Sequence, residues 1–314
     1  MNASMVRHLR YARRRMLARE VRHVKTIVAL LALAAGSAFA SRPDTLAHLM
    51  DVPAPVLLLV AGVLAVTLVC GAQRYIHQRF SERDFIQHNT VGGFIIAVVG
   101  SLYAVLLGFL TVVAWQHFTE ARGLVAQESA AASDTWHVAV GLPSAKRSQV
   151  RRDLLNYAGV MVRDEWPRMR VGGFDKNADL LVMDAMGVAG SFAPANMGQS
   201  NAQNATVQQL ATLHDFRQRR LSENASGISG FEWLVLVVGA LCVISFCWLF
   251  GLQNAPVHLM MTSTVTVLIT AAMVLLFELQ YPFRSNLAIG ADDWVSVIQH
   301  IYVMQEGMQS GMRM

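Results

Sequence analysis

The chain has 314 residues and a formal net charge of +5, with 54% hydrophobic and only 15% charged residues. A typical soluble domain carries roughly 25% charged residues, so this composition excludes an ordinary soluble globular protein, which would need far more polar surface. The net positive charge comes largely from residues 1–25. It predicts contact with anionic lipid, and no nucleic-acid partner is expected.

The basic N-terminal segment, residues 1–25, is followed by a short apolar run at 26–40, TIVALLALAAGSAFA. This run ends in Ala38-Phe39-Ala40, which has the small-x-small form of a signal-peptidase site. It is either a cleaved signal peptide or an uncleaved signal-anchor helix, and the sequence leaves both open. In both cases the basic residues are expected to stay in the cytoplasm.

Three long stretches of the remaining chain contain no Asp, Glu, Lys or Arg: those between Asp51 and Arg74, between Asp84 and Glu120, and between Glu232 and Glu278. A membrane-spanning helix needs about 20 mostly apolar residues. The first two stretches each fit one span, and the third fits two spans joined by a turn. The sequence therefore predicts an all-α, polytopic membrane protein with four core transmembrane helices, near 56–73, 91–115, 232–252 and 258–278.

A water-soluble helical insert, residues 116–231, separates the first transmembrane pair (56–115) from the second pair (232–278). Its apolar residues recur every three or four positions, which is the period of an α-helix. One helix is expected to run from the membrane through Trp136 without a break, and others near 145–166, 176–189 and 205–224. The candidate core residues are Phe118, Ala121, Val125, Ala132, Trp136, Val150, Leu154, Tyr157, Met161, Trp166, Leu210, Leu213 and Phe216. A C-terminal helical tail, 279–314, follows the last span.

Small residues fall at four-residue spacing in the second span, at Gly100, Ala104 and Gly108. Such spacing lets two helix backbones approach closely in lipid. It predicts a helix–helix contact within one subunit, or else a contact between subunits or the lining of a pore. The sequence alone leaves these interpretations open.

Hydroxyl groups form a second row in the last span, where Thr262, Thr266 and Thr270 share one face. Hydroxyl groups can line a water-filled path and replace part of the hydration shell of an ion. They can equally bond the carbonyl groups of their own helix and serve packing alone. Both interpretations stay open, and the second requires no further function.

A carboxylate, Glu128, lies near the apolar stripe of the helix that leaves the membrane. A buried carboxylate needs a cation or several hydrogen-bond donors. Arg217, Arg219 and Arg220, on the helix that returns to the membrane, are the candidate cations. We predict that Glu128 contacts Arg220 and so clamps the outgoing helix to the returning helix. The alternative is that both charges are solvated.

Aromatic and polar residues at the ends of the spans mark the expected membrane interfaces: Trp115, Phe118, Trp233, Glu278 and Tyr281. Aromatic side chains at these positions are ordinary membrane anchors. The chain has no Walker loop, dinucleotide fingerprint, GxSxG or HExxH motif. Its cysteines, Cys70, Cys242 and Cys247, lie inside predicted spans and form no CxxC motif. We therefore expect no enzyme activity, cofactor or metal site.

Several motifs together resemble a known family. GSLYAVLLGF is followed by F..AR..V..E, an LP turn, R..L..Y and EWP, and later by L..L...R..RLS, Trp233, Phe250-Gly251 and LLFELQYPF. This order resembles the bestrophin-like domain of bacterial membrane proteins of the DUF4239 type, over about 55–300. The family more usually has Asp where this chain has Glu278. The resemblance implies a multi-pass protein of the bacterial inner (plasma) membrane, a homo-oligomer, and passage of small anions.

Two hypotheses of function follow. The first is an oligomeric anion channel, with a pore lined by the small residues of the second span or the hydroxyl groups of the last. The alternative is a non-conducting, membrane-anchored sensor or scaffold whose insert binds a partner. The side of the membrane that holds 116–231 also stays open. The basic N-terminus places this insert outside the cytoplasm if 26–40 spans the membrane, whereas the resemblance places it in the cytosol.

Overall fold

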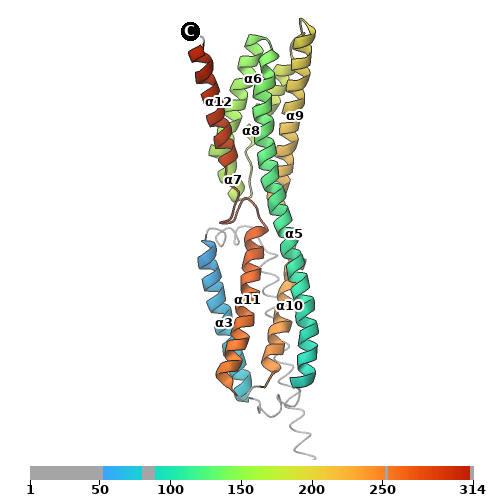
Figure 1. Cartoon of the computed structure of the whole chain (residues 1–314), viewed down its shortest axis with the longest axis vertical. Coiled ribbons are helices and arrows are strands. Elements are labelled where there is room, and N and C mark those ends of the chain that lie inside the picture. The colour runs from blue at the N-terminus through green and yellow to red at the C-terminus, as the bar shows by residue number, and fades with distance from the viewer. Residues whose placement is uncertain (1–51, 80–88, 252–253, 312–314) are drawn as a thin grey trace, which may run out of the picture. The chain divides into compact units, whose positions relative to one another are not determined.

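The computed structural model describes residues 52–79, 89–251 and 254–311, and within these ranges all long regular elements are helices (Figure 1). The segment predicted at 26–40 and the basic segment before it lie outside the described residues. The elements in chain order are α3 (Ala54–Arg79), α5 (Asn89–Val138), η1 (Ala139–Gly141), α6 (Ser144–Val160), η2 (Met161–Glu165), α7 (Trp166–Arg170), α8 (Lys176–Gly190), α9 (Met197–Ala225), α10 (Gly230–Leu249), α11 (Ala255–Leu279) and α12 (Asp292–Gly311). The all-α fold class predicted from the sequence is confirmed.

Four of these helices are long and apolar enough to cross a membrane: α3, α5, α10 and α11. They coincide with the four spans predicted from the charge-free stretches. The helix α5 has 50 residues without a break, and at a rise of 1.5 Å per residue it is about 75 Å long. The hydrocarbon core of a bilayer is only about 30 Å thick. One part of α5 therefore suits lipid and the rest must lie beyond it.

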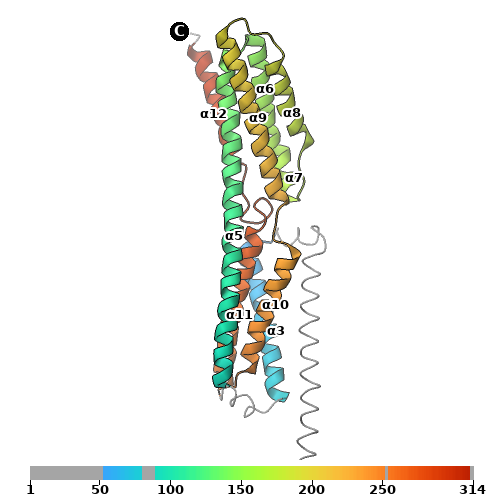
Figure 2. The ribbon, with the colours of Figure 1, turned by 90° about the vertical axis from the view of Figure 1, so that its right-hand side faces the viewer.

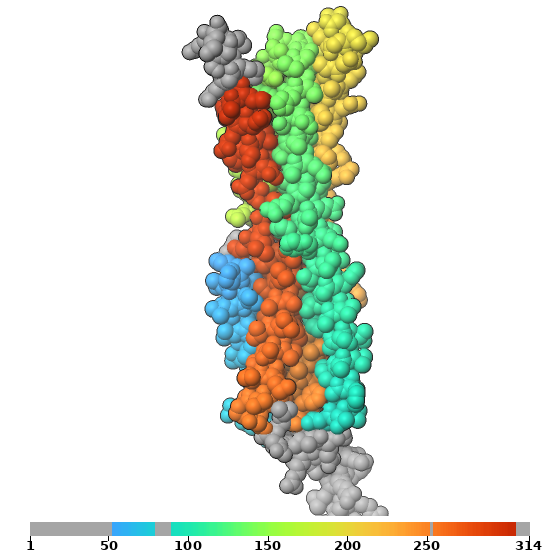
Figure 3. Space-filling view, viewed as in Figure 1, coloured from blue at the N-terminus to red at the C-terminus, as the bar shows by residue number. Residues whose placement is uncertain are grey.

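The chain divides into two compact units. The membrane unit comprises Leu58–Phe109 and Ile228–Met273, and the insert unit comprises residues 52–57, Leu110–Gly227 and the chain from Val274 onward. The helices α3, α5 and α11 each contribute residues to both units. On the face of the membrane unit in Figure 3, α11 lies between α3 and α5.

Large apolar side chains cover the outside of the membrane unit, including Leu59, Phe94, Leu102, Val105 and Leu268, which are all mostly exposed. Exposing apolar surface to water costs about 25 cal/mol per Å², so this surface requires lipid. Inside the unit the helices approach closely. A Cβ added at Gly239 of α10 would lie only 2.5 Å from the ring of Tyr103 of α5.

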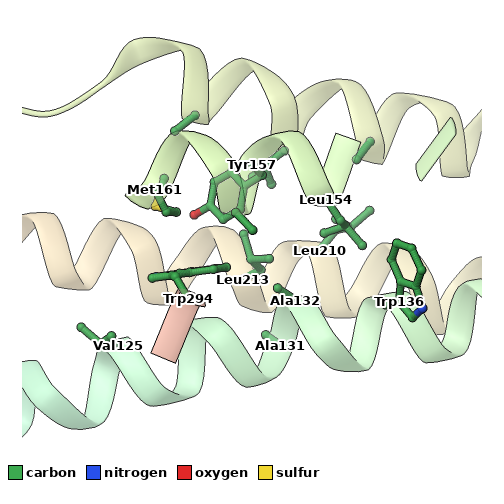
Figure 4. Close-up of a cluster of buried hydrophobic side chains, with 14 of the residues drawn as sticks. Val125, Ala131, Ala132, Trp136, Leu154, Tyr157, Met161, Leu210, Leu213 and Trp294 are labelled. Atoms are coloured by element: carbon green, nitrogen blue, oxygen red, sulfur yellow. The ribbon is translucent and has the colours of Figure 1, made fainter. Parts of the chain in front are cut away.

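The insert unit has the opposite arrangement, with a buried apolar core between its helices (Figure 4). Val125 and Ala132 come from α5, Leu210 from α9, and Trp294 from α12. The ring of Trp294 meets the ring of Tyr157 edge-on, at 5.3 Å between centroids. Most core residues predicted for the insert are buried here, and Phe118 and Phe216 are partly buried against the same cluster.

The far end of α5 is bonded by arginine side chains of the helix that follows. Arg151 donates to the carbonyl oxygen of Trp136 from Nε and Nη2, at 3.3 and 3.0 Å, and its guanidinium lies 4.5 Å over the ring of the same residue. Arg147 donates to the carbonyl oxygen of Val140 at 3.1 Å. The last carbonyl groups of a helix have no partner within the helix, and these contacts satisfy two carbonyls at this end.

The start of α9 differs from the sequence prediction. We expected this helix to begin near 205, yet α9 begins at Met197. The side chain of Asn196 accepts a hydrogen bond from the backbone N–H of Gln199 at 2.9 Å, which is a standard helix N-cap. Gln203 also donates to the carbonyl oxygen of Ala189 at 3.0 Å. Capping and side-chain bonding therefore make this polar segment helical.

Candidate functional site

Five buried side chains of the insert unit form one polar group, which we call the charge cluster: Glu128 on α5, Tyr157 on α6, Glu165 on η2, and Arg217 and Arg220 on α9. Each of them is at most 1% exposed. Two carboxylates and two guanidinium groups give formal charges that balance. Burying a charge without a partner is very costly, so the bonding within the cluster decides whether this core is stable.

The first pair in the cluster is Glu128 with Arg220. Arg220 Nε lies 2.5 Å from Glu128 Oε2, and its Nη2 donates to Oε1 at 3.1 Å. This two-point geometry is the strong form of an arginine–carboxylate contact. The hydroxyl of Tyr157 also donates to Glu128 Oε1, at 2.5 Å. The structure thus brings together the two residues that the sequence analysis paired, and adds a phenol.

The second pair is Glu165 with Arg217, at 3.2 Å between Oε1 and Nη2. The same Glu165 oxygen accepts from Arg220 at 3.2 Å, and Oε2 accepts from the backbone N–H of Asp175 at 2.6 Å. Arg217 continues outward, where Nη1 donates to Asp179 Oδ1 at 2.9 Å. Glu165 therefore joins the two arginines, and the cluster connects α5 and α9 with the segment that starts α8.

The protonation states of the cluster follow from this bonding. Burial raises the pKa of Tyr157 well above its ordinary value, and the neighbouring negative charge of Glu128 raises it further. Burial alone would lower the pKa of Arg220, but the contact with Glu128 outweighs it and holds this pKa above its ordinary value. The phenol therefore stays a donor and the guanidinium stays charged at neutral pH.

A local irregularity carries Glu165 into the cluster. Pro167 has no backbone N–H, so it cannot donate the bond that a continuous α-helix requires at this point. The five residues immediately before Trp166 form a π-helical turn, Met161–Glu165. Wide turns of this kind often occur at functional sites. Here the turn ends at the residue whose carboxylate bridges the two arginines.

The segment between α11 and α12 is bonded to the end of α9 by Arg284. Its guanidinium donates to the carbonyl oxygen and to Oδ1 of Asn224, at 2.5 and 3.3 Å, and lies 4.9 Å over the ring of Tyr281. Tyr281, predicted as an interface residue, also packs against Gly227, where an added Cβ would lie 2.6 Å from the ring. Glu278 is 1% exposed and accepts from the backbone N–H of Asn286 at 3.2 Å.

The small residues predicted to pack or to line a pore have few neighbours in the part of the chain that the structure describes. A Cβ added at Gly100 or at Gly108 would meet no atom within 4 Å apart from its own helix backbone. Ala104, between them, is exposed. Within the described residues, the row formed by these three is therefore not packed closely against another helix of the same chain.

The threonine row on α11 has the opposite environment. Thr262 and Thr266 are 2% and 1% exposed, and Thr270 is partly buried. Thr266 Oγ1 donates to the carbonyl oxygen of Thr262, and Thr270 Oγ1 donates to that of Thr266, each at 2.8 Å. These hydroxyl groups bond their own helix, which is the pattern of packing residues.

Two of the predicted interface aromatics stack on α5. The rings of Trp115 and Phe118 are 6.2 Å apart at an interplanar angle of 22°, and Trp115 is mostly exposed. Trp233, at the start of α10, is only 3% exposed. An anchoring ring must reach the lipid headgroups, and Trp115 has the exposure that this requires.

A family model for the bestrophin-like domain matches residues 63–293 of this sequence. The chain belongs to the bestrophin-like family. Among curated proteins no match is found. The matched range includes every member of the charge cluster and both rows of candidate pore residues.

Solved structures of bacterial bestrophin homologues share the fold of this bestrophin-like protein. One from Klebsiella pneumoniae, solved by Zn-SAD phasing, has 14% identity and a TM-score of 0.56, and the alignment covers 78% of this chain and 97% of that chain. A point variant of a K. pneumoniae homologue has 14% identity and a TM-score of 0.57, with 79% and 98% covered. At this identity the likeness establishes the fold.

The motif Phe250-Gly251 of the bestrophin-like protein joins α10 to the start of α5. The side chain of Asn89 donates to the carbonyl oxygen of Gly251 at 2.8 Å and accepts from its backbone N–H at 3.1 Å. The ring of Phe250 lies against Gly92, where an added Cβ would be 3.7 Å from it. These contacts give the motif a structural role within the membrane unit.

Sequence reasoning missed Glu165 as a member of the charge cluster. A signal for it exists, because Glu165 follows Tyr157 and Met161 at four-residue steps along the stripe that was predicted to be buried. The third candidate cation, Arg219, points outward instead: it is 63% exposed and pairs with Asp215 at 3.0 Å. Adjacent arginines on α9 thus have different roles because only one helix face meets the core.

Proposed function

We propose that this bestrophin-like protein is a homo-oligomeric channel of the bacterial inner membrane that conducts small anions. The family and fold support a membrane protein of this kind. The observation that carries the proposal is the row Gly100, Ala104 and Gly108 on α5, which has no close neighbour among the described residues of its own chain. A row of small side chains left open in this way leaves room for a pore when several copies assemble.

The threonine row is the less suitable lining. Thr266 is buried within a single chain and donates to its own helix, so its hydroxyl is already satisfied. A hydroxyl that coordinates a permeating anion must be free to donate towards it. We therefore assign the lining to α5 and give the threonines a packing role.

We propose a structural role for the buried charges of the insert unit. In the described ranges, no group of three or more His, Cys, Asp or Glu side chains is placed to hold a metal ion. The buried charges of the insert unit bond one another. They are proposed to position helices rather than to react with a substrate.

Reconstitution in liposomes tests the channel directly. The purified protein should pass halide ions above the rate of empty vesicles. Ala104→Trp should abolish this flux by filling the proposed lining, whereas Val105→Trp, at the mostly exposed neighbouring position on the same helix, should leave it unchanged. Absence of flux in the unmodified protein, across pH and calcium concentration, would contradict the channel and favour the non-conducting scaffold.

A further inference from the structure

The helix α8 of the insert unit exposes a row of residues at alternating spacings of four and three: Lys176, Leu180, Met183, Gly187 and Gly190. This spacing is that of a coiled-coil seam, which faces a partner helix along its length. Leu180 and Met183 are more than half exposed. A Cβ added at Gly187 or Gly190 would meet no atom within 4 Å. The seam of α8 thus has two large apolar residues, followed by two glycines with free space beside them.

The helix α12 exposes a second row: Asp292, Val295, Gln299 and Tyr302 follow one another at steps of three or four, and Val303 lies directly after Tyr302. Tyr302 and Val303 are 56% and 68% exposed. The opposite face of α12 is already buried, since Trp294 and Ile301 are at most 1% exposed in the core of the insert unit. The part of α12 that carries Tyr302 and Val303 is thus apolar on both faces, which is typical of a buried helix. The outer face of α12 therefore lacks a partner within the described chain.

The two rows are complementary in charge. The seam of α8 starts with Lys176, and the exposed side chain of Arg170 lies six residues before it, whereas Arg168 pairs with Asp175 at 3.0 Å. The row on α12 starts with Asp292, followed directly by Asp293. Opposite charges on facing surfaces favour one pairing and its register. Here they favour the start of α8 against the start of α12.

The two rows are also complementary in size when the helices run in the same direction. With Lys176 opposite Asp292, residues an equal distance along each helix face one another, so Gly187 comes opposite Val303. The bulky end of the α12 row then meets the small end of the α8 seam. Close packing requires large side chains to face small ones, and this register provides that.

One chain cannot make this contact by itself. Both helices start at the same end of the insert unit, because Trp166 Nε1 donates to the carbonyl oxygen of Ile289 at 3.0 Å and so places the residues before α12 beside α7. In Figure 2, however, α12 and α8 lie at opposite edges of this unit, and α6 packs against both of them. Each row therefore needs a helix from another molecule.

We propose that α8 of one copy packs in parallel against α12 of a second copy of this chain, with Lys176 opposite Asp292. The partner is a second copy because both complementary rows are carried by every chain. Two different patches that meet in this way form a heterologous contact, which builds a ring when the rotation from copy to copy closes. The inference rests on the homo-oligomer of the proposed function and names the contact that joins its insert units.

Cysteine cross-linking between two tagged chains tests the contact, in a background where Cys70, Cys242 and Cys247 are replaced by alanine. One chain carries Gly187→Cys and the other carries Val303→Cys. Oxidation should give a dimer that contains both tags. The matched control replaces the second cysteine with Gln208→Cys, an exposed position on α9, and should give no dimer above background.

Charge reversal tests the register independently. Lys176→Asp alone should reduce the cross-linked fraction, and Lys176→Asp combined with Asp292→Lys on the other chain should restore it. An oligomer that stays intact by native mass spectrometry while Gly187→Cys and Val303→Cys fail to cross-link would overturn the contact and leave the channel untouched. A cross-linked ring that passes no halide would overturn the channel and leave the contact in place.

Discussion

The charge cluster of the insert unit buries two carboxylates and two guanidinium groups, whereas the polar groups buried along α11 in the membrane unit include hydroxyls that bond their own helix. The charged groups depend on partners from other helices, so each is stable only while the helices stay in place. The hydroxyl of Thr266 needs nothing beyond α11. The interior of the insert unit should therefore be far more sensitive to single substitutions than that row of the membrane unit.

The largest effect is expected for Arg220→Met, which leaves Glu128 buried without its cation. Removing one partner of a buried ion pair costs about 3–5 kcal/mol of unfolding free energy. Urea unfolding of the detergent-solubilised chain, followed by tryptophan fluorescence, measures this loss. Arg219→Met is the matched control, since that side chain is 63% exposed, and should change stability by no more than about 0.5 kcal/mol.

Exchanging the charges of the first pair sharpens the same test. The double variant Glu128→Arg with Arg220→Glu should recover part of the stability that either single change removes, because the two side chains can still meet. A double variant no more stable than the singles would show that the pair does not clamp α5 to α9.

Tyr157→Phe is expected to cost about 1.5–3 kcal/mol, the usual value of a hydrogen bond to a charged group. The loss should also depend on pH. Because the pKa of Tyr157 is raised in the folded state by burial and by Glu128, its contribution is fully present below about pH 10, the ordinary tyrosine value, and declines as the pH rises beyond it. Alkaline unfolding curves of both proteins should therefore converge, and a constant difference would contradict this.

Gly239→Ala tests the packing of the membrane unit instead of its polar groups. The added Cβ would lie 2.5 Å from the ring of Tyr103, and overpacking of this kind costs about 1–3 kcal/mol. Gly62→Ala on α3 is the control, because nothing lies within 4 Å of its added Cβ. Thermal unfolding in detergent should show a lower Tm for the first variant only. Adding Tyr103→Ala to Gly239→Ala should remove the clash.

The smallest effect is expected for Thr266→Val. The hydroxyl donates to a carbonyl of its own helix, and valine keeps the size and shape of the side chain, so the loss should stay below about 1 kcal/mol. Halide flux should also remain, since the lining is assigned to α5. A loss as large as that of Arg220→Met would remove the contrast between the two interiors.

The elements that the sequence predicted correctly depend on local composition. The four spans follow from the absence of charge, and the long course of α5 follows from the absence of proline or a turn signal before Trp136. The Glu128–Arg220 contact was also within reach, because an apolar stripe that contains a carboxylate requires a cation. Each of these features can be predicted from the residues of one helix, or from one face on each of two helices.

The elements that were missed depend on contacts between distant segments. Glu165 joins the cluster through a π-turn, and the start of α9 depends on a cap at Asn196. Arg284 bonds Asn224, a residue from another part of the chain. Helical periodicity says nothing of such side-chain-to-backbone bonds. The solvent-exposed rows on α8 and α12 have helical spacing too, but only the structure shows that their opposite faces are already buried.

The contacts of Arg151 and Arg147 at the end of α5 have a further electrostatic consequence. The aligned peptide dipoles of a helix leave a partial negative charge at its C-terminal end. On a helix of 50 residues this end would repel any anion that came near the tip of the insert unit. Two guanidinium groups bonded to the carbonyls of Trp136 and Val140 reverse the local sign. The tip of α5, the longest helix among the described residues, therefore presents positive charge to its surroundings.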